Sequence, residues 1–168
     1  MISFTILYLM EIEGYENYLI YEDGKVYNQK FKRYLKQNTY RNGYLYVNLC
    51  NDGKLKKHSI HRLIGTYYIP NPENKKCIDH INRIRIDNRI ENLRWATHSE
   101  NQQNRGVQKN NKLGIKNISY DKGMNRYKYN KMFNKVCDRK YFKTLEEAVE
   151  YKKIYEVNLN YLRLNLLL

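Results

Sequence analysis

The stretch Ile78-Asp79-His80-Ile81-Asn82 decides the fold, together with Asn92-Leu93-Arg94-Trp95 and Ser99-Glu100-Asn101. It places a carboxylate directly before an imidazole and then supplies two carboxamides, 13 and 22 residues after Asp79. Carboxylate and carboxamide oxygens are hard ligands that suit Mg²⁺ better than Zn²⁺. Because imidazole accepts a proton from water near neutral pH, the pattern is typical of metal-assisted hydrolysis.

The charge of the chain indicates a polyanionic partner. Its 168 residues include 31 Lys plus Arg against 17 Asp plus Glu, a formal net charge of +14. Each basic contact to a phosphate releases a condensed counterion, which favours nucleic acid as the partner. The alternative is a soluble basic surface with no specific partner. Uneven placement favours the first interpretation, because residues 25–62 hold ten basic residues and one acid.

The cysteines and the apolar N-terminal segment indicate in which cellular compartment the protein is found. Cys50, Cys77 and Cys137 are far apart and form no C-x-x-C pair, so a zinc ribbon is excluded and reduced thiols are expected. The apolar segment Ile2–Met10 is too short to span a bilayer and has no preceding Lys or Arg, so we expect a strand or an inessential leader. These features predict an intracellular protein that is not secreted.

Two hairpins are expected before residue 60. Alternating runs surround the Asp23-Gly24 turn, and a second pair of runs, 44–49 and 56–60, surrounds Asn51-Asp52-Gly53. A short helix is predicted over 61–68 because Pro70 and Pro72 end it. Thr97 and Glu100 form a capping box that begins a second helix, with Asn101 in its first turn.

The last part of the chain is predicted to be a three-stranded sheet with one helix. Strand-like segments cover 114–120, 126–133 and 136–142, after a polar linker at 106–112. A second capping box, Thr144 with Glu147, opens an amphipathic helix. The apolar end, 164–168, has no explanation from the sequence.

The residues of 76–105 resemble those of the HNH endonucleases, and above all the homing endonucleases of phages and giant viruses. The resemblance rests on Asp79-His80-Ile81-Asn82, Asp87-Asn88, Asn92–Thr97 and Asn101, with His61-Arg62-Leu63 and Ile69–Pro72 upstream. Residues 114–120 and 142–148 resemble an AP2-type DNA-binding domain, and residues 14–27 resemble the small module that often precedes an HNH domain.

The resemblance implies an α+β fold with a ββα-metal (His-Me finger) core. It predicts four regions: an N-terminal β-hairpin DNA-binding module at 1–54, the HNH nuclease domain at 55–105, a linker at 106–112, and an AP2-like three-stranded sheet plus helix at 113–168.

The resemblance also implies roles for individual residues. His80 is expected to be the general base, and Asn92 is expected to orient its ring. Asp79 and Asn101 are expected to hold one Mg²⁺ or Mn²⁺ per active site. Arg94 would contact the scissile phosphate or form a surface ion pair. The expected DNA contacts of the C-terminal module are Lys116, Arg126 and Lys128.

Several nearby residues are given structural roles. Trp95 is expected in the core, and His61 is expected beside the site as a structural residue. His98 could lie on the helical face of Asn101, three residues away, but is kept outside the site. His58 is expected to be an exposed strand residue or a phosphate contact.

Two function classes follow. The first is a metal-dependent DNA endonuclease, a homing enzyme acting as a monomer that nicks double-stranded DNA in a virus-infected host cell or a phage-infected bacterium, with no membrane and no small-molecule cofactor. The second is a non-catalytic DNA-binding regulator derived from such an enzyme. A weaker third interpretation, RNA binding, rests only on charge and aromatic residues.

Overall fold

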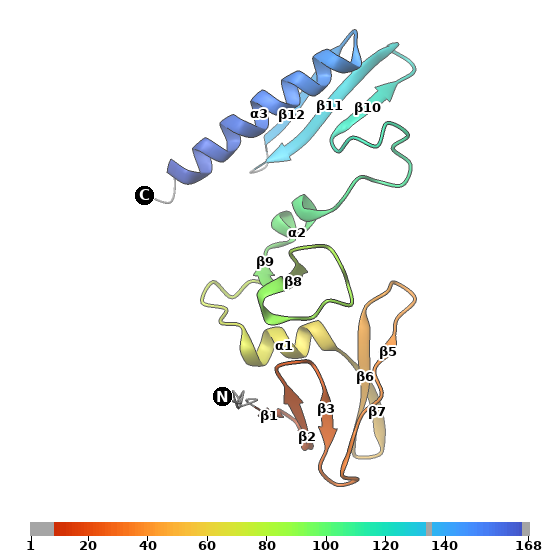
Figure 1. The fold of residues 1–168 in the computed structure, drawn as a ribbon, viewed down its shortest axis with the longest axis vertical. Helices are drawn as coiled ribbons and strands as arrows, with labels where there is room; N and C mark the ends of the chain where they lie inside the picture. Colours follow the sequence, from red (N-terminus) through yellow and green to blue (C-terminus); the bar gives the residue numbers. More distant parts are fainter. Residues whose placement is uncertain (1–8, 134–135, 166–168) are drawn as a thin grey trace, which may run out of the picture. The chain divides into compact units, whose positions relative to one another are not determined.

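The computed structural model describes residues 9–133 and 136–165, and the chain divides into two compact units (Figure 1). One unit ends at Arg105 and the other begins at Gly106. Residues 2–8 of the apolar N-terminal segment and the last three of the C-terminal one lie outside the described residues.

The first unit begins with two small antiparallel sheets. The first has the strand order β1 (Leu9–Ile12), β2 (Tyr15–Tyr21), β3 (Val26–Asn28) and β4 (Arg33–Tyr34). The second has the order β5 (Asn38–Thr39), β6 (Leu45–Asn51) and β7 (Lys54–Ser59). Both predicted hairpins are present, with Gly24 and Gly53 in the left-handed conformation that their turns require.

The rest of the first unit contains the motif. It comprises helix α1 (Ile60–Tyr68), β8 (Cys77–His80), the 3-10 turn η1 (Ile90–Asn92), β9 (Leu93–Ala96) and α2 (His98–Asn104). Strands β8 and β9 pair antiparallel, with Asp79 opposite Arg94. The predicted capping box is confirmed at α2, because Thr97 Oγ1 accepts from the Glu100 amide and the Glu100 carboxylate accepts from the Thr97 amide. The result is a ββα arrangement.

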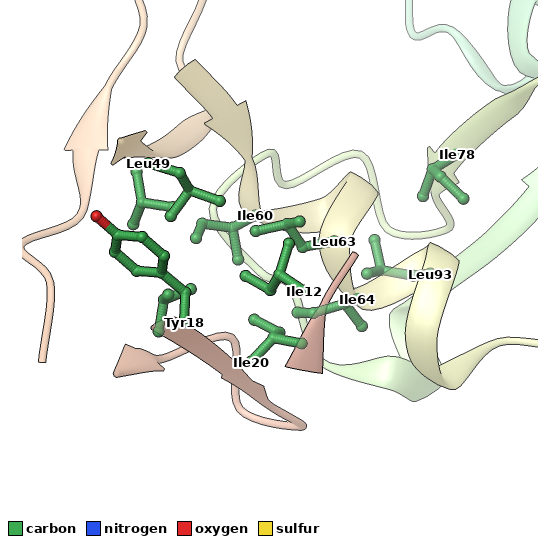
Figure 2. Packing of buried hydrophobic residues seen from close by; sticks show 11 residues of the cluster. Ile12, Tyr18, Ile20, Leu49, Ile60, Leu63, Ile64, Ile78 and Leu93 are labelled. Atoms are coloured by element: carbon green, nitrogen blue, oxygen red, sulfur yellow. The ribbon is translucent and has the colours of Figure 1, made fainter. Parts of the chain in front are cut away.

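One hydrophobic core holds the hairpins and the motif together (Figure 2). Ile20 from β2, Leu49 from β6 and Ile64 from α1 are fully buried in it. The same cluster includes Ile78 of β8, the strand that carries both Asp79 and His80, and Leu93 of the paired strand β9. The predicted boundary at residue 54 therefore does not separate two cores, because α1 packs between the sheets and β8.

Helix α1 approaches β8 closely at a glycine. A Cβ built on Gly65 would lie 2.3 Å from Ile78 Cδ1, so a larger residue here would displace the strand that bears the motif. Trp95 lies beside this contact, and its indole donates to the Ile69 carbonyl at 2.9 Å. The indole is partly buried against the core, as predicted. The packing of α1 at Gly65 thus fixes the position of β8, the strand that carries Asp79 and His80.

The second unit is a three-stranded antiparallel sheet with a helix on one face. Its elements are β10 (Ile118–Asp121), β11 (Arg126–Phe133), β12 (Val136–Phe142) and α3 (Leu145–Asn165). Ile118, Tyr129 and Ala148 form its buried centre. Thr144 and Glu147 form the predicted capping box at α3. The first strand is shorter than predicted, because Gly114 and Asn117 adopt left-handed conformations before it.

No helix within the described parts of the chain is both long and apolar enough to cross a membrane. All three cysteines are free thiols, as predicted from their spacing.

Candidate active site

His80 ends strand β8 as a buried residue, only 4% exposed. Its Nε2 lies 2.9 Å from Asn88 Oδ1. With the carboxamide oxygen toward the ring, Asn88 accepts the hydrogen of Nε2, which leaves the lone pair on Nδ1. This geometry supplies one oriented imidazole nitrogen that can take a proton.

Asn92 does not hold the His80 ring, and this corrects the predicted contact. Its carboxamide accepts from the Asn82 amide at 2.9 Å and donates to Asn82 Oδ1 at 3.0 Å and to the Asp87 carbonyl at 2.7 Å. Both amide hydrogens are therefore used within the loop that joins β8 to η1. Asn92 fixes this loop, and the loop in turn carries Asn88 to the ring.

An ion pair strengthens the same loop. Arg89 donates to both oxygens of the Asp87 carboxylate, at 2.8 and 2.9 Å. These hydrogen bonds, with one from Asn82, hold the pKa of the Asp87 carboxyl well below its usual range. Asp87 therefore remains an anion at physiological pH and keeps its contact with Asn82, at 2.7 Å.

Asp79 lies beside His80 on the other face of β8 and is 6% exposed. Arg94 of the paired strand donates to its Oδ2 from Nε at 3.1 Å and from Nη2 at 2.9 Å. Arg94 was predicted either to contact the scissile phosphate or to form an ion pair, and the structure contains an ion pair with Asp79. The guanidinium is about half exposed, so it also faces solvent, where a phosphate could approach.

The side chain of α2 that contacts Asp79 is Asn104, and not the predicted metal ligand Asn101. Asn104 Nδ2 donates to both Asp79 oxygens at 3.0 Å and to the His80 carbonyl at 2.8 Å. Asn101 lies three residues earlier on α2, half-buried, and has no hydrogen bond to Asp79 among the described residues. Both carboxamides share one side of the helix because three residues are close to one turn.

The donor atoms of the described residues show which kind of divalent cation could bind at Asp79. No group of three or more His, Cys, Asp or Glu side chains that could hold a metal occurs within 9–133 and 136–165. A single carboxylate with one carboxamide oxygen still fits Mg²⁺ or Mn²⁺, because such ions keep several waters and take few protein ligands. Asp79 with the carboxamide oxygen of Asn101 would be such a pair, whereas Asn104 turns its Nδ2 toward Asp79.

The rings of His61 and Tyr44 pack beside the His80 ring. The His61 ring lies 5.3 Å from the His80 ring and 4.8 Å from the Tyr44 ring, centroid to centroid. His61 is 8% exposed, and its Nδ1 has no hydrogen-bond partner within the described part of the chain. His61 is thus beside the site, where it was expected.

Acid should weaken the first unit through His61. Burial, with the charges of His80 and Arg62, lowers the pKa of His61 to about 4, against 6.5 in the unfolded chain. The unfolded state binds this proton first, so the stabilisation is complete above about pH 6.5 and is lost as pH falls toward 4. The expected loss at pH 4 is about 2–3 kcal/mol.

Urea unfolding of wild type and His61→Gln at pH 7.5 and 4.5 checks this expectation. The wild type should lose more stability than the variant, in which the other acidic groups still titrate. Equal losses in the two proteins would show that His61 does not bind a proton on unfolding in this pH range.

Other predicted residues lie around this centre. His98 begins α2 and lies 3.4 Å from the buried Cys77 thiol through Nδ1, so it packs against β8. His58 is half-buried in β7 and contacts the Tyr15 hydroxyl at 3.1 Å. The contacts of Asn88 and Asn104 were missed because sequence spacing does not show which side chain of a loop or of a helix turns toward the site. Asn88 already stands within the Asp87-Asn88 pair of the motif.

Residues 58–103 match the sequence model of the HNH endonuclease family. The HNH segment, as we call these residues, contains His80, Asp79, Asn88 and Asn92 but ends one residue before Asn104. The chain also resembles two uncharacterized HNH endonucleases of Acanthamoeba polyphaga mimivirus. One is 38% identical over 92 residues and the other 43% identical over 95 residues, in each case 55% of this chain.

The chain spans about a quarter of the length of these relatives, 28% of one and 24% of the other. A solved structure, described as DNA binding and cleavage by the HNH homing endonuclease I-HmuI, has a similar fold with a TM-score of 0.56. It is 24% identical and covers 86% of this chain and 83% of its own. The family match and the names of the relatives support a nuclease.

Proposed function

We propose that this chain is a metal-dependent DNA endonuclease of the homing type, which hydrolyses phosphodiester bonds and nicks one strand. The single observation that carries this proposal is the buried pair of Asp79 and His80, held by Arg94 and Asn88 on a ββα unit within the HNH segment. The similarity in fold to a homing endonuclease supports DNA as the substrate.

His80 acts as the general base in this proposal. Its Nδ1 takes a proton from the water that attacks phosphorus, while Asn88 holds Nε2. Burial of the ring against His61 and Tyr44 excludes bulk water from its other face. The contacts of the ring thereby fix the direction in which the Nδ1 lone pair of His80 points.

Asp79 would hold a Mg²⁺ or Mn²⁺ ion together with the carboxamide oxygen of Asn101, the predicted ligand, while Asn104 Nδ2 orients the Asp79 carboxylate. When bound, such an ion supplies a Lewis acid for the phosphate and for the leaving oxygen. Arg94 would then exchange part of its contact with Asp79 for the scissile phosphate. Its half-exposed guanidinium can reach outward for this contact.

The second unit supports DNA binding outside the catalytic centre. Side chains alternate along β11, and Tyr129 is buried toward α3, so Arg126 and Lys128 lie on the opposite face of the sheet. We propose that this face, together with Lys116 before β10, contacts DNA as an AP2-like module would. The relatives from a giant virus support a viral gene expressed inside an infected cell.

A non-catalytic DNA-binding regulator is the alternative, and chelation separates the two. An end-labelled DNA library incubated with the chain should be shifted in a native gel with EDTA and cut on one strand in a denaturing gel with Mg²⁺. A shift of equal strength in both conditions with no cut would favour the regulator. One active site per chain, acting as a monomer, predicts cutting of one strand in each binding event.

Asn88 should act as a positioning residue for His80. Replacing Asn88 with alanine frees the imidazole to rotate and should slow single-turnover nicking by about 10–100-fold, as for other residues that orient a reacting imidazole. Replacement with aspartate keeps an acceptor on Nε2 but adds a negative charge that favours the protonated imidazole. The rise of the nicking rate with pH should therefore move to higher pH.

The pH–rate profiles of wild type, Asn88→Ala and Asn88→Asp measure this effect. Gln102, an exposed residue of α2, provides the control as Gln102→Ala. If the pH–rate profile of Asn88→Asp matches that of the wild type and Asn88→Ala nicks at the wild-type rate, Asn88 does not position the His80 ring.

A further inference from the structure

An isoleucine stands exposed four residues after the general base. Ile84 is 52% exposed, although isoleucine is among the residue types most often buried in proteins. It lies in the loop between β8 and η1, which also supplies Asn88 to the His80 ring. An apolar side chain at this position contributes nothing to the described core.

Hydrogen bonds on both sides fix the backbone of Ile84. Its amide donates to Asn82 Oδ1 at 2.8 Å, and its carbonyl accepts from the Asp87 amide at 3.0 Å. Asn82 and Asp87 are themselves joined at 2.7 Å. The exposure of Ile84 is therefore built into the loop, since turning it inward would break these contacts.

Arg83 places an exposed cation next to this isoleucine. Its φ of +66° is the left-handed conformation that side chains disfavour, and its amide is held by the His80 carbonyl at 2.9 Å. Its guanidinium has no ion pair within the residues that the structure describes. The loop thus presents the Arg83 cation and the apolar Ile84 side chain next to each other. The Arg83 amide is hydrogen-bonded to the His80 carbonyl.

Ile86 in the same loop is 61% exposed but has a different setting. It borders a hollow in which four carboxylates, those of Glu22, Asp23, Asp87 and Glu91, outnumber the single guanidinium of Arg89. A polyanion would be repelled there. Ile86 therefore provides a matched control of the same size, loop and exposure.

We propose that Ile84 is a wedge that enters the minor groove of double-stranded DNA beside the scissile phosphate, with Arg83 on an adjacent phosphate. Apolar side chains that enter between base steps unstack them and kink the duplex, and arginines favour the minor groove. The kink would turn the scissile phosphate outward toward His80. This inference rests on the proposed function, because it takes DNA as the substrate.

Unwinding of plasmid DNA tests the wedge without any cleavage. The His80→Ala protein, which cannot nick in this account, is bound to plasmid in EDTA, and a type I topoisomerase that needs no metal relaxes the DNA. A wedge that unstacks base pairs lowers the linking number for each bound molecule. Adding Ile84→Ala should remove at least about half of this change, whereas adding Ile86→Ala should leave it unaltered.

Nicking rates give a second readout in the protein with His80 intact. Ile84→Ala should slow single-turnover nicking about tenfold at saturating protein, because the phosphate is less well placed, while Ile86→Ala stays within about twofold. Equal linking-number changes for the two variants, or none with the His80→Ala parent, would overturn the wedge. If the wild type binds and unwinds DNA but never cuts, the proposed function fails and the wedge stands.

Discussion

Replacing His80 with alanine should reduce DNA nicking by about 10²–10⁴-fold, which is the usual contribution of a general base. Without the imidazole, the nitrogen that Asn88 orients to take the proton from water is lost. The affinity for DNA should change little, because the ring is only 4% exposed and carries none of the contacts to the backbone that we propose. Single-turnover nicking and a gel shift in EDTA measure the two quantities separately.

His98→Ala provides the matched control for this experiment. His98 lies on α2 and contacts Cys77 of β8, so its loss perturbs the same ββα unit without removing the proposed base. We expect its nicking rate to remain within a few-fold of the wild type. An unchanged rate for His80→Ala would show that another group takes the proton.

Replacing Asp79 with asparagine should have the second largest effect, a loss of at least about 100-fold in nicking rate. The substitution preserves the shape of the side chain but removes the negative charge that would attract a divalent cation. It also leaves the Arg94 guanidinium without its partner. Because that guanidinium is half exposed, water can replace the carboxylate and the cost in stability should be small.

The dependence of the rate on Mn²⁺ concentration distinguishes this effect from misfolding. Asp79→Asn should require far more Mn²⁺ for its residual activity, while its urea unfolding midpoint stays close to that of the wild type. Glu91→Gln removes the same charge from an exposed site in the HNH segment and should respond to Mn²⁺ like the wild type. A normal Mn²⁺ dependence for Asp79→Asn would exclude Asp79 as a ligand.

Local signals in the sequence predicted much of this fold. The two capping boxes, at Thr97 and Thr144, were correct because a side chain and a backbone amide only three residues apart decide them. The hairpins at Gly24 and Gly53 were predicted for the same reason, since their turns need a left-handed residue. Such features depend on neighbours in the chain and not on distant contacts.

Contacts between distant segments could not be predicted in the same way. The prediction assigned the orientation of the His80 ring to Asn92, whereas the loop brings Asn88 to the ring and Asn92 to the Asp87 carbonyl. It likewise did not distinguish Asn101 from Asn104, which lie one turn apart on the same side of α2. Which turn of the helix meets Asp79 depends on how α2 packs against β8.

The shared core of the hairpins and the motif could not be predicted from local signals either. The resemblance implied an N-terminal module at 1–54, and the structure places Ile20 and Leu49 of its hairpins in one core with Ile64 of α1. A short amphipathic helix and small sheets each leave an apolar side uncovered, and they bury these sides together. The position of His80 is therefore supported by residues from the N-terminal hairpins.

The most direct test of the account is the incubation of supercoiled plasmid with the purified chain in Mg²⁺, in Mn²⁺ and in EDTA, in parallel with His80→Ala. We predict conversion to open circle with either metal, none with EDTA, and none with the variant. Plasmid that is retarded in a gel by the wild type but stays supercoiled with both metals would contradict the account and favour a protein that only binds DNA.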